Sequence, residues 1–304
     1  MSDDSAARWL LLFNPVSGRG QGLRDRARIE AAAAAAGLAT DSVVSEYAGH
    51  CIALVADAIA AGRRRFLIAG GDGSLSEAVN GVFARWEVDP RLITLAQVPI
   101  GTGNDWARGN GVPRDYDGAL RLAAAGRTRE FDVGTIDFAA GGRRHFINVA
   151  GIGFDAGVVE NMPSRKLGRL AYLIGLIREL IAYRPLDLRF VCGGETHAAK
   201  AFLLFSCLGR YCGGGMHVAP NAIDDDGQLD LVLIRHLRLM QVLRALPRLF
   251  DGSIESHPAV TIRRHPAVEL TASAGAAIEA DGELVGHAPA RIDVMRRAIR
   301  IVVP

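Results

Sequence analysis

Lysine is scarce in this sequence, and the lysine-bearing nucleotide motifs are missing. Lys166 and Lys200 are the two lysines of the 304-residue chain, although lysine and arginine together number 35. No GxxxxGK[ST] sequence occurs, which excludes a P-loop enzyme. No GxGxxG sequence follows the first strand-like run, which disfavours the usual dinucleotide-binding fold. The net charge of +2 is too small to indicate a nucleic-acid partner.

Cysteine and long apolar runs are scarce too. The four cysteines form no CxxC pair and the first residues, MSDDSAARWL, do not resemble a signal peptide, so we expect a reducing, cytoplasmic compartment. The longest apolar helix-like run, 170–183, contains Arg178 and Glu179 and is too short to cross a bilayer. The eight histidines show no HExxH or HxH spacing, so a transition-metal site is not expected.

The first part of the chain alternates between strand-like and helix-like patterns. Apolar runs typical of buried strands lie at 9–15, 41–47, 65–71 and 92–99. Patterns with helical spacing lie at 23–36, 51–62, 74–86 and 116–126. This alternation predicts an α/β nucleotide-binding domain with an open, mostly parallel sheet.

The pattern changes near Arg129, after which short strand-like runs dominate. Such runs, separated by turn signals, predict a second, all-β domain of the sandwich type. Helical patterns interrupt it at 166–183 and 237–250. We place the domains at 1–132 and 133–304, and the sequence leaves open whether the last strand returns to the first domain.

Glycine turns follow three of the predicted strands, at 14–20 (NPVSGRG), 70–74 (GGDGS) and 101–105 (GTGND). Ligands of open α/β sheets bind at the carboxyl ends of the strands, and glycine lets the backbone approach a phosphate closely. The three turns together therefore predict a nucleotide site. Asp72 is a carboxylate in an anion-binding turn, which makes chemical sense if Mg²⁺ or a donor hydroxyl also binds there.

These turns and several later blocks resemble the diacylglycerol kinase catalytic-domain family, which includes bacterial soluble lipid kinases and sphingosine kinases. The blocks occur in family order over 10–304, and GTGND together with the DDGxLD and DGE blocks is more specific than GGDG, which NAD kinases and phosphofructokinases share. The blocks read LLFNPVSGRG, IAGGDGSLSEAVNGV, PIGTGNDWAR, FINVAGIGFDA, GGGMHVAPNAIDDDGQLDLVLI and IEADGELVG.

The resemblance implies ATP as co-substrate and Mg²⁺ as the metal. It places the Mg²⁺ ligands at the carboxylate of Asp226 and the backbone carbonyls of Ile223 and Gln228. It makes Glu283 the proton acceptor, with Asp281 beside it, and Asp72 is the other candidate for that role. The implied ATP contacts are Asn14, Pro15, Val16, Ser17, Gly18, Ser45, Gly71, Asp72, Gly73, Ser74, Leu75, Ser76, Glu77 and Thr102.

Two positions depart from the family pattern, because Ser74 replaces the common threonine and Trp106 replaces a phenylalanine. Both changes preserve the chemistry of the side chain. Spacing alone makes Asp226 and Asp281 turn residues, since each precedes a glycine in a hairpin-type DG pair. Ser74 and Glu77 also have the spacing of a capping box at the start of a helix.

The resulting hypothesis is a lipid kinase that transfers the γ-phosphate of ATP to a lipid hydroxyl in a cleft between the domains. Diacylglycerol is the expected acceptor; a NAD kinase-like enzyme and a non-catalytic lipid- or nucleotide-binding regulator are the alternatives. A membrane-embedded substrate implies peripheral membrane contact, for which the basic, apolar segment 164–184 is a candidate, although core packing is its simpler interpretation. The sequence does not decide which lipid is the acceptor or whether the protein forms a homodimer.

Overall fold

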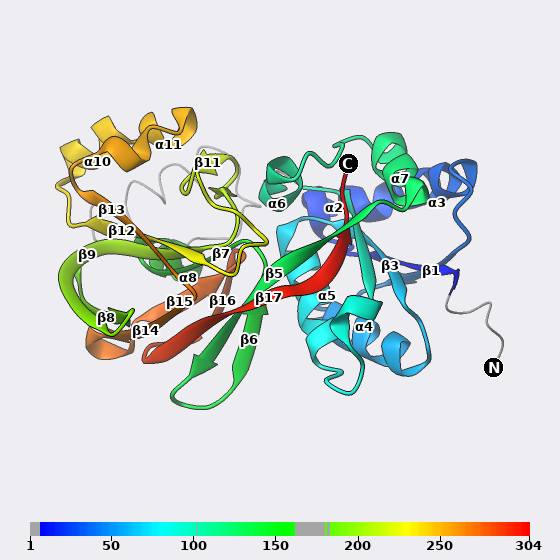
Figure 1. Ribbon diagram of the computed structural model, residues 1–304. Coiled ribbons are helices and arrows are strands. Elements are labelled where there is room, and N and C mark those ends of the chain that lie inside the picture. Colours follow the sequence, from blue (N-terminus) through cyan, green and yellow to red (C-terminus); the bar gives the residue numbers. More distant parts are fainter. Residues whose placement is uncertain (1–6, 102, 162–179, 181–182) are drawn as a thin grey trace. The chain divides into compact units, whose positions relative to one another are not determined.

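The computed structural model describes residues 7–101, 103–161, 180 and 183–304, which fall into two compact units (Figure 1). Unit 1 contains Met1–Val133 and Arg296–Pro304, and unit 2 contains Gly134–Met295. The sequence boundary was placed at 132, one residue before this division. Two strands, β5 (Thr128–Phe138) and β17 (Ala290–Val302), contribute residues to both units.

Unit 1 is built on a parallel sheet in the order β2-β1-β3-β4-β17. The last strand does return to this unit, because Arg300 and Ile301 pair with β4. Strands with consecutive apolar residues suit a parallel sheet, since helices cover both of its faces. The strands are β1 (Trp9–Phe13), β2 (Thr40–Val44), β3 (Arg65–Gly70) and β4 (Thr94–Pro99).

Helices lie on both faces of this sheet, with α3 and α7 on one side and α4 and α5 on the other (Figure 1). Leu11, Phe13 and Leu67 of the strands pack with Ile29 of α3 and Leu120 of α7 in one apolar cluster. The mostly parallel α/β fold is thereby confirmed. The helices are α2 (Ser17–Arg24), α3 (Arg26–Ala35), α4 (His50–Ala60), α5 (Asp72–Phe83), α6 (Asp105–Gly109) and α7 (Tyr116–Ala125), with the 3₁₀ turn η1 (Pro90–Leu92).

The prediction of one helix over 23–36 is wrong at its start. The chain divides at Asp25 into α2 and α3, and α2 contains three consecutive residues with left-handed backbone, Gly18, Arg19 and Gly20, at φ 58°, 59° and 84°. Glycine adopts the left-handed conformation without strain. The glycine-rich stretch at 18–20 therefore bends the chain before α3 begins at Arg26.

Unit 2 is all-β around antiparallel strands in the order β16-β15-β7-β9-β8-β14-β17, with β12 pairing β9 and β13. The sandwich-like class predicted for this domain is confirmed. The helices in its described residues are short: α8 (Phe154–Asn161), α10 (Leu239–Ala245) and α11 (Arg248–Asp251). The remaining elements are β6 (Arg143–Phe146), β7 (Val149–Gly153), β8 (Leu186–Cys192), β9 (Glu195–Cys207), β10 (Tyr211–Cys212), β11 (Met216–His217), β12 (Leu229–Arg235), β13 (Val260–His265), β14 (Ala267–Ala272), β15 (Ala277–Ala280) and β16 (Glu283–His287), with the 3₁₀ turns η3 (Ile254–Ser256) and η4 (Ser273–Gly275).

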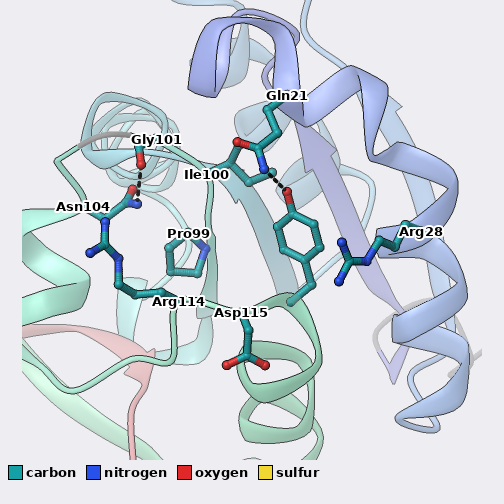
Figure 2. A pocket seen from close by; sticks show the side chains of 9 residues that line it. Gln21, Arg28, Pro99, Ile100, Gly101, Asn104, Arg114 and Asp115 are labelled. Carbon is teal, nitrogen blue, oxygen red and sulfur yellow. Dashed lines mark hydrogen bonds between the residues drawn. The ribbon is translucent and has the colours of Figure 1, made fainter.

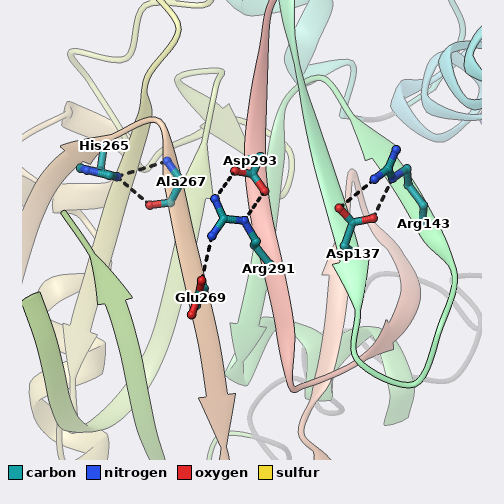
Figure 3. Close-up of polar contacts among 7 residues, drawn as sticks. All are labelled: Asp137, Arg143, His265, Ala267, Glu269, Arg291 and Asp293. Atoms are coloured by element: carbon teal, nitrogen blue, oxygen red, sulfur yellow. Dashed lines mark hydrogen bonds and ion pairs between the residues drawn. The ribbon is translucent and has the colours of Figure 1, made fainter. Parts of the chain in front are cut away.

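At β8 and β14 of unit 2, one face of the sheet is apolar and the other polar, as expected of antiparallel strands with one solvated face, whereas β12 and residues 201–207 of β9 are buried on both faces. Leu188 and Leu270 belong to its buried cluster. On the solvated face, Arg291 joins Glu269 of β14 to Asp293 of its own strand at 2.7 and 2.8 Å, as Figure 3 shows. In the same view, Arg143 bridges β6 to β5.

The predicted helix at 166–183 lies outside the described residues, apart from 180 and 183. The helical prediction for 237–250 is confirmed as the pair α10 and α11, which are interrupted at Pro247. Among the described residues, no helix combines the length and the apolarity that a bilayer span requires.

Packing at the start of unit 2 gives a test of this fold. A Cβ on Gly134 would lie 2.1 Å from Cε1 of Phe146, whose ring is fully buried. We expect Gly134→Ala to lower the free energy of unfolding by about 2–3 kcal/mol, measured by urea denaturation. The same substitution should cost less in a Phe146→Leu background, because the ring is then absent. Equal losses in both backgrounds would contradict the clash.

Candidate functional site

The carboxyl ends of β1 and β3 form the switch point of the unit 1 sheet. From β1 the chain passes through α2 and α3 to β2 on one side, whereas β3 and β4 lie on the other. Open α/β sheets bind ligands at such points. The loops at 14–20 and 70–74 leave the sheet here, and Ser45 joins them because its N–H donates to the carbonyl of Phe13 at 2.9 Å.

One side-chain hydrogen bond ties the two loops together. Asn14 Nδ2 donates to Ser74 Oγ at 2.9 Å, and Asn14 Oδ1 accepts from the N–H of Val16 at 3.1 Å. This use of the Ser74 hydroxyl makes the predicted capping box wrong. The N-cap of α5 is Gly71, no side chain caps it, and Ser74 lies inside the helix.

Glycine is required where these loops meet. A Cβ on Gly70 would lie 2.3 Å from Ser74 Oγ, so no side chain fits there without displacing Ser74. The twelve-residue helix α5 begins two residues later and presents its first backbone N–H groups at this edge. Helix N-termini and close glycine backbone together favour a phosphate ligand.

Asp72 holds the neighbouring loop. Its Oδ2 accepts from the N–H of Asp105 at 3.0 Å and its Oδ1 accepts from the N–H of Trp106 at 3.1 Å. Asp105 and Trp106 are the first two residues of α6. The carboxylate among the glycines thus has a structural reason that involves no ligand. Its predicted role beside metal or substrate stays a prediction.

Leu75, Ser76 and Glu77 have buried side chains. Glu77 accepts from the N–H groups of Gly49 and Cys51 at 2.9 and 3.1 Å, so it satisfies the start of α4. Their predicted ATP contacts, and those of Pro15, Ser17 and Gly73, stay predictions. Thr102 lies outside the described residues.

A pocket of about 270 Å³ lies beside this edge, at the end of β4 (Figure 2). The guanidinium of Arg28 stacks over Tyr116 at 5.3 Å, and the Tyr116 hydroxyl donates to Asp25 at 2.7 Å. Burial, reinforced by Asp25, raises the pKa of Tyr116 to about 12. Two of the lining residues, Gly101 and Asn104, belong to the glycine turn at 101–105 that the sequence assigns to the nucleotide site. The lining residues are Gln21, Arg28, Pro99, Ile100, Gly101, Asn104, Arg114, Asp115 and Tyr116.

Asn104 is the most informative of the residues that the sequence analysis missed. It is buried, has left-handed backbone at φ 49°, and its Oδ1 has no hydrogen-bond partner among the described residues. A buried acceptor without a partner costs free energy, so a ligand N–H or O–H is expected to satisfy it. Asn104 lies in the GTGND turn predicted for the nucleotide site, where Thr102 is the one residue implied as an individual ATP contact.

In unit 2, Asp281 and Gly282 form the turn of the β15–β16 hairpin with φ 50° and 87°. The Asp281 carboxylate accepts from three successive backbone N–H groups, those of Ile147, Asn148 and Val149, at 3.0 to 3.2 Å. Asp281 is therefore a turn residue that also acts as a clamp, meaning that its carboxylate holds the backbone of 147–149 in place. Its predicted catalytic role stays a prediction.

Glu283 begins β16 and has a different kind of partner. Its Oε2 lies 3.3 Å from Nη2 of Arg144, and both side chains are about one-third exposed, at 34% and 28%. Arg144 carried no signal in the sequence, because the pairing joins residues 139 positions apart.

The predicted metal residues do not form a metal cage. Asp226 Oδ2 is paired with Arg264, and its Oδ1 accepts from the N–H of Gln228 at 3.0 Å. Asp230 lies 3.6 Å from Arg264, and burial raises the pKa of its carboxyl. No group of three His, Cys, Asp or Glu side chains suited to a metal ion occurs in the described part of the chain. The predicted donor set consists of the Asp226 carboxylate and the backbone carbonyls of Ile223 and Gln228. Because Arg264 already holds its single carboxylate, we derive no step through a bound metal.

Comparisons with known proteins place the chain in a family. A profile described as the diacylglycerol kinase catalytic domain matches residues 8–136, and one described as the YegS C-terminal NAD kinase beta sandwich-like domain matches 148–303. The class is thus a kinase with an α/β catalytic domain and a β-sandwich domain. The chain belongs to the diacylglycerol kinase family, whose members use ATP.

Relatives match along nearly the whole chain. A diacylglycerol kinase of Mycobacterium tuberculosis is 31% identical over 96% of this chain and 94% of its own length. A diacylglycerol kinase of Staphylococcus aureus is 28% identical over 97% and 91%. A crystal structure described as a diacylglycerol kinase from Bacillus anthracis superposes with a TM-score of 0.78 over 98% of this chain and 97% of the other, at 24% identity. That last likeness shows the fold.

The buried Glu77 carboxylate gives a test of the unit 1 architecture. We expect Glu77→Ala to lower the free energy of unfolding by about 2–3 kcal/mol, because two backbone N–H groups at the start of α4 lose their acceptor. Glu77→Gln keeps one acceptor oxygen and should lose less. Thermal and urea denaturation of the three proteins measure this order, and equal stability of Glu77→Ala and wild type would refute the anchoring role.

Proposed function

We propose that the protein is a lipid kinase that transfers the γ-phosphate of ATP to the hydroxyl of diacylglycerol and forms phosphatidic acid. The observation that carries the nucleotide half of this proposal is the hydrogen bond from Asn14 to Ser74, which joins the loops after β1 and β3 at the switch point of the sheet. The lipid half is supported by relatives named diacylglycerol kinase.

In the proposed reaction, the glycine backbone after β3 and the N-terminus of α5 hold the phosphates of ATP. Asn104 Oδ1 accepts a hydrogen bond from the nucleotide. The lipid hydroxyl oxygen attacks the γ-phosphorus, its proton passes to Glu283, and the bond to the β-phosphate breaks to release ADP. Asp226, with the backbone carbonyls of Ile223 and Gln228, would hold Mg²⁺ only if its carboxylate exchanged Arg264 for the ion, and such an ion would neutralise phosphate charge.

A NAD kinase-like activity is the second candidate, because the C-terminal domain matches a profile described as NAD kinase beta sandwich-like. The two candidates differ in the acceptor. We expect radiolabelled ATP to label diacylglycerol in mixed micelles and to leave NAD unlabelled, as resolved by thin-layer chromatography. Labelling of NAD alone would contradict the lipid assignment, and ATP binding without turnover of either acceptor would favour a regulator.

Glu283 and Asp281 of the β15–β16 hairpin are expected to differ in role: one affects the reaction rate and the other affects stability. We expect Glu283→Gln to lower kcat by at least about 100-fold with little change in stability, because a general base is lost. Asp281→Ala is the matched control and should lower the free energy of unfolding by about 2 kcal/mol, since three N–H groups lose their acceptor. Steady-state kinetics and urea denaturation make the comparison; wild-type kcat in Glu283→Gln would show that Glu283 is not the base.

A further inference from the structure

Helices α10 and α11 of unit 2, which Figure 1 labels, carry several exposed apolar residues. Met240 and Phe250 expose 58% and 65% of their surface. Single exposed apolar residues need no explanation, but a group of them marks a contact surface. We call this group the α10–α11 face; its members are Leu239, Met240, Leu243, Leu246 and Phe250.

The opposite side of the same helices is fixed to unit 2. Val242 and Ala245 are buried, and Val242 belongs to an apolar cluster with Phe205 of β9 and Val232 of β12. Leu249 of α11 packs against that cluster. The packed side fixes the two helices on unit 2, while the residues of the α10–α11 face keep 36% to 65% of their surface exposed.

Basic residues outnumber acidic ones along these helices. Between 235 and 251 the sequence contains Arg235, Arg238, Arg244 and Arg248 and one acid, Asp251, which lies near Arg248. The first three arginines are exposed, and no ion pair between described residues includes them. Apolar side chains flanked by an excess of arginine complement the acyl chains and anionic headgroups of a phospholipid surface.

A second copy of the chain fits this face less well. Two such faces packed symmetrically would bring the arginines of both copies together, and unpaired like charges repel. We propose that the α10–α11 face docks on anionic phospholipid membranes, with Met240 and Phe250 entering the acyl boundary and the arginines contacting headgroups. Its biological sense rests on the proposed lipid-kinase function, but it assigns residues that the proposed reaction does not use.

Vesicle co-sedimentation tests the proposal without ATP or diacylglycerol. The wild-type protein should bind vesicles of phosphatidylglycerol and phosphatidylcholine and bind pure phosphatidylcholine much more weakly. Met240→Ser/Phe250→Ser should weaken binding to the anionic vesicles at least about tenfold, because two inserting side chains are lost. Arg238→Gln/Arg244→Gln should also weaken it at least about tenfold and lose most of the salt dependence, since each arginine contributes about fivefold.

Matched controls lie in unit 1. Trp86→Ser removes an apolar side chain that is 88% exposed, and Arg121→Gln/Arg127→Gln removes two exposed arginines; both should bind like wild type. Thermal denaturation checks that every variant is folded. Wild-type protein that does not bind anionic vesicles, or α10–α11 variants that bind as well as wild type, would overturn the proposal. A wild-type dimer that Met240→Ser/Phe250→Ser converts to a monomer at unchanged vesicle binding would assign the face to a second copy.

Activity on a water-soluble, short-chain diacylglycerol separates this proposal from the proposed function. If docking and catalysis are both correct, Met240→Ser/Phe250→Ser should keep wild-type activity on the soluble substrate and lose at least about tenfold on diacylglycerol in anionic vesicles. Equal activity of this variant and wild type on both substrates would overturn the docking role. No activity of wild type on the soluble substrate, with vesicle binding intact, would count against the kinase assignment alone.

Discussion

Carboxylates that accept hydrogen bonds from backbone N–H groups hold the functional loops of this protein in place. A backbone N–H removed from water needs an acceptor, and irregular loops cannot supply one from a neighbouring strand. Asp72 meets this need at the start of α6, Glu77 at the start of α4, and Asp281 along the segment before β7. The family motifs therefore lie on loops whose shape is set before any ligand binds.

The acids of the family motifs look alike in the sequence but have different hydrogen-bond partners in the structure. Asp72, Glu77 and Asp281 accept hydrogen bonds from backbone N–H groups, Glu283 pairs with an arginine, and Asp226 has both an arginine partner and a backbone donor. An arginine can also bind a phosphate oxygen, so a side-chain ion pair can rearrange when a nucleotide arrives. A clamp on successive backbone N–H groups cannot rearrange without unfolding its loop. Under the proposed function, the acid that accepts the proton, Glu283, is one with an arginine partner.

Local sequence patterns predicted most of the fold, because apolar runs and helical spacing reflect burial directly. They failed in two places: the helix over 23–36 divides at Asp25, next to a glycine-rich stretch with left-handed backbone, and the Ser74–Glu77 capping box gives way to partners 60 and 28 positions distant. The DG turn at Asp281 followed from its spacing, but its clamp did not. Pairings such as Arg144 with Glu283 depend on how strands are brought together, which one sequence does not reveal.

The proposed kinase function requires that a nucleotide bind where the loops after β1 and β3 meet. Hydrogen–deuterium exchange with and without ATP and Mg²⁺ tests this claim directly. We predict slower exchange in peptides covering 14–20 and 70–77, together with the segment around Asn104, whose buried acceptor gains a partner. Unchanged exchange in all three segments under conditions where ATP binding is demonstrated would place the nucleotide elsewhere and contradict the account.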